Sequence, residues 1–266
     1  MTPVGQAEYE RLVERAQQDE AIVGLVLTGS RGRDAFIREA SDWDVRVVVR
    51  DDAFDDGVIR YATPHGSKVE VAVYRLSTFA RLNEVGSDMG WDRYSYVHAK
   101  VVVDRLEGGF AQMVTAMAYL PPERARSLAA WDLDGYVNAY YRSLKNWRVG
   151  LEHEAHLDAA ESVPLLLSAL FAIHERVRPF NRFLGWELEH FPLPGDVWSA
   201  PVLLPRLQAI LSAGDVGVQT ALFRDTENLA RSHGHGEVVD SWEPDLDWLR
   251  TGQSPRRAQG TDLPGE

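Results

Sequence analysis

Two carboxylates and a glycine-serine pair lie close together near the start of the chain. Gly29 and Ser30 close one apolar segment, and after eleven further residues Asp42 and Asp44 open a second one. Residues two apart on a strand project from the same face, so we expect the two carboxylates side by side at a strand end. Neighbouring carboxylates repel each other unless a cation lies between them, and Mg²⁺ prefers such oxygen ligands. The pair therefore predicts a magnesium site.

The glycine-serine pair predicts a phosphate site beside the metal. A turn of this kind presents backbone N–H groups and a hydroxyl, and both bind phosphate oxygens. We expect Gly29 to let the backbone approach the phosphates, Ser30 to bond them, and Arg31 and Arg33 to add positive charge. A metal and a phosphate at one site indicate phosphoryl or nucleotidyl transfer.

A third acidic residue completes this pattern. Glu70 lies in an alternating apolar segment, residues 68–74, which predicts a further strand. We expect Asp42, Asp44 and Glu70 to form the catalytic and metal-binding set. The alternative for the two aspartates is a solvated turn that caps a helix, and for Glu70 it is an exposed position on an edge strand.

Together these residues resemble the signature of the DNA polymerase beta-like nucleotidyltransferase superfamily. That signature is an apolar strand, Gly-Ser, a spacer, Asp-apolar-Asp on a second strand and an acidic residue on a later strand, and it covers residues 22–73 here. The resemblance implies a domain that binds an NTP, most commonly ATP, together with two Mg²⁺ ions. Two ions in such a site stabilise the attacking and the leaving oxygens.

The elements that must position these residues alternate between strand and helix in the first part of the chain. Hydrophobic patterning predicts helices over 6–18, just after Gly29, 77–85 and 108–120. It predicts strands over 22–27, 43–49, 58–62, 68–74 and 97–103, with an acidic turn over 51–57. The predicted fold class is α+β, with a mixed sheet in the N-terminal domain.

The second half of the chain is expected to be an α-helical bundle. Apolar residues recur at helical spacing from 133 to 151, and further helices are predicted over 163–177, 203–211 and 217–230. This places Pro164 in a first turn, where proline is tolerated. The predicted domains are a nucleotidyltransferase domain (1–121), a helical bundle domain (122–251) and a disordered tail (252–266).

This layout resembles the aminoglycoside and lincosamide (antibiotic) nucleotidyltransferase branch of the superfamily. The resemblance implies transfer of AMP from ATP to a hydroxyl of a small acceptor, such as an aminoglycoside-like antibiotic, with release of pyrophosphate. Three alternatives stay open. They are a nucleotidyltransferase for a protein or tRNA acceptor, of the toxin-neutralising type, a natural-product tailoring enzyme, and a non-catalytic nucleotide-binding protein.

A polar helix face in the second half extends the site prediction. Arg142 and Lys145 fall near one face of the predicted 133–151 helix, and Arg148 lies close by. Their charges suit the phosphates of the NTP, and the alternative is a solvated face with i,i+4 ion pairs. The general base that takes the proton of the acceptor hydroxyl stays open between four residues: Glu70, Glu152, Glu154 and Glu175.

Composition and charge narrow the class of partner. The chain has 266 residues, a net charge of −12 and no cysteine, which excludes a disulfide framework and a thiol nucleophile. Nucleic-acid-binding proteins usually carry a basic surface, so a small cationic acceptor is favoured over nucleic acid. Only three of the 28 basic residues are lysines, and one of them, Lys68, lies in the segment of Glu70. With no signal pattern and no run of about eighteen apolar residues, we expect a cytoplasmic monomer or homodimer without membrane contact.

Overall fold

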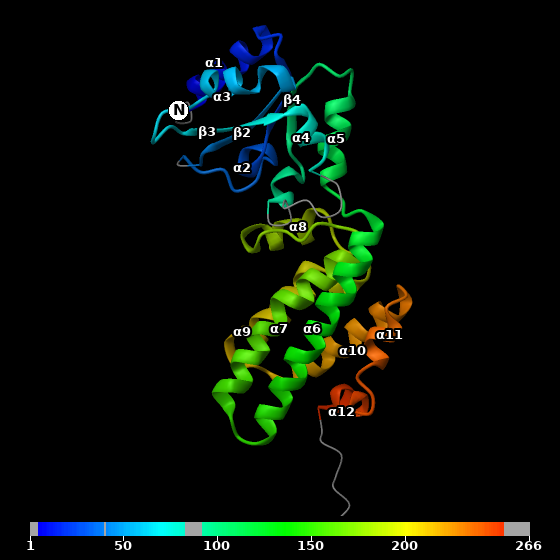
Figure 1. Ribbon diagram of the computed structural model, residues 1–266. Coiled ribbons are helices and arrows are strands. Elements are labelled where there is room, and N and C mark those ends of the chain that lie inside the picture. The colour runs from blue at the N-terminus through cyan, green and yellow to red at the C-terminus, as the bar shows by residue number, and fades with distance from the viewer. Residues whose placement is uncertain (1–4, 40, 83–91, 253–266) are drawn as a thin grey trace, which may run out of the picture. The chain divides into compact units, whose positions relative to one another are not determined.

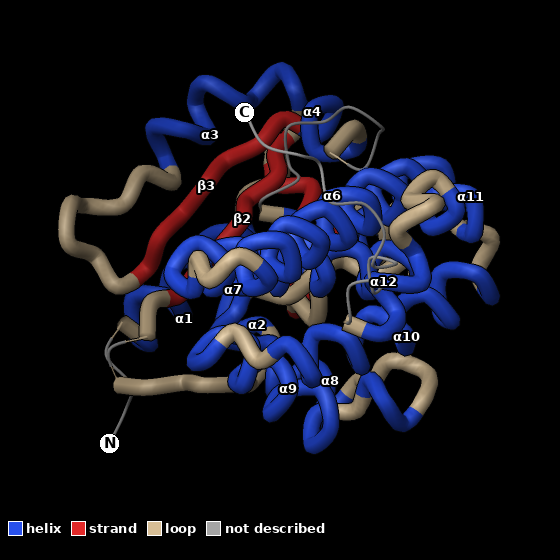
Figure 2. The backbone as a smooth tube through the Cα atoms, turned by 90° about the horizontal axis from the view of Figure 1, so that it is seen from below, coloured by secondary structure: helices blue, strands red, loops and turns tan. Residues whose placement is uncertain are grey.

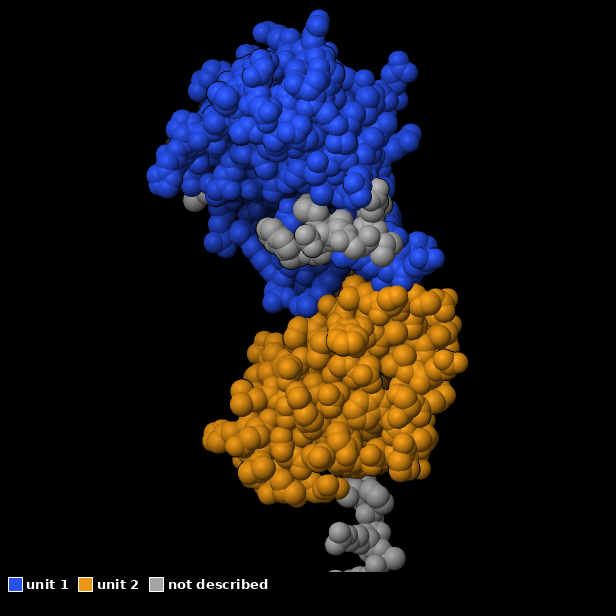
Figure 3. All heavy atoms as spheres, viewed as in Figure 1, with its two compact units in different colours: residues 1–125, 175–186 blue, residues 126–174, 187–266 orange. Residues whose placement is uncertain are grey.

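The computed structural model describes residues 5–39, 41–82 and 92–252 and divides into two compact units (Figure 3). Unit 1 comprises Met1–Ala125 and Glu175–Trp186, and unit 2 comprises Arg126–His174 and Glu187–Glu266. The chain therefore returns to unit 1 for a short segment after it has entered unit 2. Unit 1 contains a mixed sheet and the C-terminal region is helical, which confirms the predicted α+β class.

Unit 1 is built on a four-stranded sheet in the order β3-β2-β1-β4 (Figure 1). β1 pairs antiparallel with β2 and with β4, whereas β2 pairs in parallel with β3. Figure 2 shows β2 and β3 side by side. The strands are β1 (Ile22–Leu27), β2 (Trp43–Val49), β3 (Val69–Arg75) and β4 (Lys100–Asp104). The surrounding helices are α1 (Gln6–Gln18), α2 (Gly29–Gly32), α3 (Phe54–Arg60), α4 (Leu76–Ala80) and α5 (Gly109–Met117).

The connection between β2 and β3 is helical, so the predicted strand over 58–62 and the predicted turn over 51–57 are wrong. A short 3-10 helix, η1 (Asp51–Ala53), leads into α3. Parallel strands need a crossover connection, and a helix is its usual form. The apolar side chain of Ile59, which favoured a strand, is 78% exposed, while Gly57 packs closely on Val49 of β2. The parallel pairing of β2 and β3 therefore determines the conformation of this segment, although its apolar pattern favours a strand.

The other elements of unit 1 follow the hydrophobic pattern closely. α1, β1 and β2 have the predicted bounds. The predicted strand over 97–103 begins only at Lys100, because the 3-10 helix η3 (Arg93–Tyr96) and a turn precede it. The predicted helix over 77–85 ends at Ala80 as α4, and its part beyond residue 82 lies outside the described residues.

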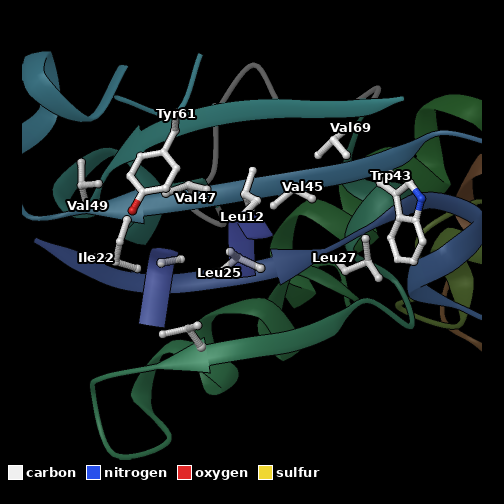
Figure 4. Close-up of a cluster of buried hydrophobic side chains, with 12 residues drawn as sticks. Leu12, Ile22, Leu25, Leu27, Trp43, Val45, Val47, Val49, Tyr61 and Val69 are labelled. Atoms are coloured by element: carbon white, nitrogen blue, oxygen red, sulfur yellow. The ribbon is translucent and has the colours of Figure 1, made fainter. Parts of the chain in front are cut away.

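The two faces of the sheet carry separate apolar clusters. On one face, side chains of β1, β2 and β3 pack with Leu12 of α1 and with Tyr61, which follows α3 (Figure 4). On the other face, Val48 of β2 packs with Phe79 of α4 and Phe110 of α5. Because alternate residues of β2 face the two clusters, both the position and the orientation of this strand are fixed by packing.

Unit 2 is helical throughout the part of it that the structure describes. Its long helices are α6 and α7, and the first turn of α6 still belongs to unit 1. The helices from this point of the chain onward are α6 (Pro122–Arg148), α7 (Glu152–Ile173), α8 (Leu184–His190), α9 (Ala200–Ala213), α10 (Val216–Ser232), α11 (Gly236–Asp240) and α12 (Leu246–Thr251), with the 3-10 helices η4 (Asn181–Phe183) and η5 (Asp196–Trp198). Of these, η4 and the first three residues of α8 belong to the segment that returns to unit 1.

α7 continues through Pro164, so the prediction that a helix begins near this proline is wrong. An interior proline removes one backbone hydrogen bond and costs about 3 kcal/mol. The helix tolerates this cost because residues such as Leu166 and Leu170 are fully buried in unit 2. By length and composition alone α7 could cross a membrane, but more than half of its apolar stretch is buried inside the structure, as in the core helix of a bundle.

The close packing of Gly24 in β1 on Phe110 provides a test of this fold. A Cβ at Gly24 would come within 2.4 Å of Cδ1 of the fully buried Phe110 ring. We predict that Gly24→Ala lowers the free energy of unfolding in urea by about 1–3 kcal/mol, because the core becomes overpacked. In a Phe110→Leu background the same substitution should cost less. An equal cost in both backgrounds would contradict the packing explanation.

Candidate active site

The predicted aspartates lie at the start of β2, beside the start of β3. Asp44 is paired in register with Glu70, and Asp42 immediately precedes β2. Lys68 immediately precedes β3, and its carbonyl accepts the N–H of Trp43 at 2.7 Å. Parallel pairing therefore brings four ionisable side chains together, and we call Asp42, Asp44, Lys68 and Glu70 the β2–β3 site.

Trp43 fixes the orientation of the strand at this point. The Trp43 ring stacks on the ring of Tyr9 in α1, with 4.2 Å between the ring centroids. The Arg31 guanidinium lies over the Trp43 ring, 4.2 Å from its centroid. Trp43 belongs to the apolar cluster that contains Leu12. Because side chains alternate along a strand, Asp44 must project from the opposite face.

The glycine-serine turn lies directly against Asp44. Gly29 has a φ of +66°, and a Cβ there would fall 2.1 Å from Asp44 Oδ2. Glycine alone combines this left-handed conformation with such a close approach. Thr28, the preceding residue, donates its N–H and its hydroxyl to the Asp44 carbonyl at 2.8 and 3.1 Å. The structure thus brings Thr28 and Gly29 to Asp44, and Ser30 follows directly in α2. Binding of phosphate by the turn and of metal by Asp44 stays a prediction.

Asp44 is a partly buried carboxylate with a raised pKa. Burial is the largest cause, and the negative charges of Asp42 and Asp92 act in the same direction. The positive charges of Arg46 and Arg33 act against them. A carboxylate that is costly to ionise in the free protein gains correspondingly when a cation binds beside it.

Asp42 is more exposed and forms an ion pair. Lys68 Nζ donates to Asp42 Oδ1 at 3.0 Å, and the two side chains are 39% and 41% exposed. Lys68 was not among the predicted site residues. Its rarity in an arginine-rich chain and its position two residues before Glu70 were the signals that could have found it. Glu70 itself is exposed.

The donor set fits Mg²⁺ if substrate supplies further oxygens. Within residues 5–39, 41–82 and 92–252, no three His, Cys, Asp or Glu side chains gather closely enough to hold a metal ion alone. Mg²⁺ in proteins usually takes one or two carboxylates together with substrate phosphates and water. Asp42 and Asp44, next to a turn suited to phosphate, match that requirement.

Arg31 and Arg33 are buried, and both donate hydrogen bonds to backbone carbonyls. Arg31 donates Nε and Nη2 to the Ser41 carbonyl at 3.2 and 3.0 Å. Arg33 donates Nη2 to the carbonyls of Tyr94 and Val97 at 2.9 and 3.3 Å. Binding of phosphates by Arg31 and Arg33 stays a prediction. It would require their guanidinium groups to give up these hydrogen bonds to backbone carbonyls of unit 1.

The segment that returns to unit 1, residues 175–186, packs on the loop that follows α2. The Arg33 guanidinium lies 4.3 Å from the ring centroid of Phe183. Phe36 meets the same ring edge-on at 5.5 Å, and Arg182 donates to the Phe36 carbonyl at 3.3 Å. The mixture of arginine and aromatic residues in this segment thus completes the packing of unit 1 around Arg33.

The three basic residues predicted on α6 lie in unit 2 and contact neighbours of that unit. Arg142 forms ion pairs with two acidic residues of α7. Lys145 and Arg148 lie over the rings of Tyr141 and Trp248, at 5.3 and 4.8 Å from the ring centroids. Binding of nucleotide phosphates by these three residues stays a prediction.

Comparisons with solved structures show similarity to several chains. No protein-family model matches the chain, and no curated protein matches it. The chain is similar in structure to a nucleotidyltransferase-like protein from Exiguobacterium sibiricum 255-15, with a TM-score of 0.44 and 11% sequence identity. This similarity covers 88% of the present chain and 78% of the other. The likeness concerns the fold and assigns no role to any residue.

The raised pKa of Asp44 predicts that Asp44→Asn stabilises the free protein at neutral pH. A raised folded-state pKa stabilises the fold at low pH, and that contribution is lost as pH rises through it. The variant does not undergo this loss, so its free energy of unfolding should exceed that of the wild type at neutral pH.

Urea unfolding from acid to neutral pH measures this difference, which should vanish in acid. Asp56→Asn, at an exposed position of α3, controls for the removal of a surface charge. An Asp44→Asn protein that is less stable than the wild type at neutral pH would contradict the prediction.

Proposed function

We propose that this protein is a magnesium-dependent nucleotidyltransferase. It transfers a nucleoside monophosphate, AMP from ATP, to a hydroxyl of a small acceptor and releases pyrophosphate. The observation that carries the proposal is the contact of the Gly29 turn with Asp44, next to Asp42 and in register with Glu70. A phosphate-binding turn and two carboxylates suited to Mg²⁺ then serve one bound nucleotide.

Each residue has a defined task in this proposal. Asp42 and Asp44 bind Mg²⁺, which when bound neutralises charge on the phosphate oxygens. The N–H groups of the turn and the Ser30 hydroxyl bind the phosphates that leave as pyrophosphate. Partial burial of Asp44 lowers the local dielectric and strengthens these interactions. The acceptor oxygen bonds to the α-phosphorus, and the bond from that phosphorus to the bridging oxygen breaks.

Glu70 is assigned as the general base. It is exposed and stands beside Asp44, and it is not part of a preassembled three-carboxylate metal group among the described residues. A base must come within hydrogen-bond distance of the hydroxyl whose proton it takes, and Glu70 lies next to the proposed metal ligands. Glu152 and Glu154 belong to α7 in unit 2, and Glu175 opens the segment that returns to unit 1.

The acceptor in this proposal is a small cationic molecule of the aminoglycoside type, and the reaction takes place in the cytoplasm. The support is electrostatic, because a net charge of −12 attracts cations and repels a nucleic-acid backbone. This supports an amine-bearing acceptor over tRNA.

The test is pyrophosphate release with Mg²⁺, each of four NTPs and a panel of aminoglycosides, lincosamides and other hydroxylated molecules. Asp42→Asn and Asp44→Asn should each lower acceptor-dependent release by at least about a hundredfold, because a metal ligand is lost. Asp56→Asn should leave release unchanged. Circular dichroism verifies that all variants are folded.

Retained turnover in both site variants would contradict the proposal. Release only with tRNA or protein would replace the small acceptor with a macromolecular one. Binding of Mg²⁺–NTP without release on any acceptor would favour a non-catalytic nucleotide-binding protein.

Glu70→Gln separates proton transfer from metal binding. A lost general base should lower kcat by about 10²–10⁴-fold, with little change in the Mg²⁺ concentration needed for half-maximal rate. The measurement is kcat as a function of Mg²⁺ for the wild type and the variant. Full recovery of the variant at saturating Mg²⁺ would instead make Glu70 a metal ligand.

A further inference from the structure

The β2–β3 site places a lysine on one of its two proposed metal ligands. Lys68 Nζ lies 3.0 Å from Asp42 Oδ1, an oxygen that a metal ion would use. The root of this side chain is held firmly, because Gly5 packs so closely that a Cβ there would lie 2.7 Å from Lys68 Cβ. Its ammonium end is not enclosed, since the side chain is 39% exposed. The side chain is therefore anchored at its base and partly exposed at its charged end.

The arginines near the glycine-serine turn differ from Lys68 in this respect. Arg31 and Arg33 are only 5% and 6% exposed, and both donate to backbone carbonyls. A lysine is also better suited to movement than an arginine, because its ammonium is a compact charge on a flexible stem whose three donors need no fixed plane. Lys68 thus differs from both arginines in its exposure and in the flexibility of its charged group.

We propose that Lys68 is an exchangeable counter-ion of the site, an inference that rests on the proposed function. In the free protein its ammonium neutralises Asp42. When a divalent cation and a nucleotide bind, Lys68 gives up Asp42 Oδ1 and binds a phosphate oxygen of the nucleotide instead. The exchange follows from charge, because an ammonium group and a divalent cation repel each other and compete for the same oxygen.

This exchange predicts effects of opposite sign when the lysine is removed. Without its competitor a divalent cation should bind Asp42 more tightly. Without its phosphate ligand the nucleotide, with metal present, should bind more weakly. A lysine that only stabilises the strand ends through its ion pair would not produce this reversal.

The experiment uses Mn²⁺ as the metal probe, with free Mn²⁺ followed by electron paramagnetic resonance. A non-reacting α,β-methylene analogue of ATP is the nucleotide probe. Lys68→Met should bind Mn²⁺ roughly threefold to tenfold more tightly than the wild type. It should bind the analogue in the presence of Mn²⁺ about tenfold more weakly.

Lys100→Met is the matched control. Lys100 is 48% exposed and forms an ion pair with Asp34 in the same unit, so its removal also deletes one lysine and one ion pair. Both affinities should stay at the wild-type value in this variant. If Lys68→Met fails to fold, Lys68→Gln removes the same charge with a polar side chain.

Two results would overturn the inference while leaving the proposed function intact. They are an unchanged Mn²⁺ affinity, or an unchanged analogue affinity, in a folded Lys68 variant when the wild type binds both probes. Absence of Mn²⁺ binding by both the wild type and the variant, even in the presence of the analogue, would overturn the inference together with the proposed metal site.

Discussion

The geometry of the site depends on the pairing of β2 with a strand on each side, antiparallel to β1 and parallel to β3. Because side chains alternate, a shift of one residue would turn Asp44 into the apolar cluster and Val45 toward the glycine-serine turn. Val45, Val47 and Val49 are fully buried, and exposing each would cost about 1.5–3 kcal/mol. The apolar face of the strand therefore holds the charged face in place.

The same pairing explains the charge pattern of the site. Parallel register sets Glu70 beside Asp44, and the residues just before each strand, Asp42 and Lys68, meet as an ion pair. Asp44 is the partly buried member and is costly to ionise, while Lys68 remains partly exposed. A partly buried carboxylate with a raised pKa thus stands next to a partly exposed ion pair. Ionisable groups with shifted pKa values are common at functional sites.

Much of unit 1 could be predicted because its signals are local. α1, β1 and β2 follow directly from apolar periodicity, and Gly29 is explained by its left-handed φ beside Asp44. α3 was missed because the need for a crossover arises from a parallel pairing that no short segment encodes. The burial of Arg31 and Arg33 was missed for the same reason, since their carbonyl partners come from tertiary contacts. The Lys68–Asp42 pair likewise appears only once the register of two strands is known.

The discontinuous composition of unit 1 has a consequence for the order in which the chain folds on the ribosome. N-terminal units generally fold first during synthesis, at about 5–20 residues per second. Here the segment Glu175–Trp186, with the Phe183 ring that covers Arg33, is made only after all of α6 and all of α7. Until this segment emerges, the aromatic surface around Arg33 lacks its cover. Unit 1 is therefore complete only several seconds after its N-terminal part has been synthesised. Because unit 1 consists of two separate segments of the chain, a single crossover between genes cannot exchange one whole unit for that of another protein.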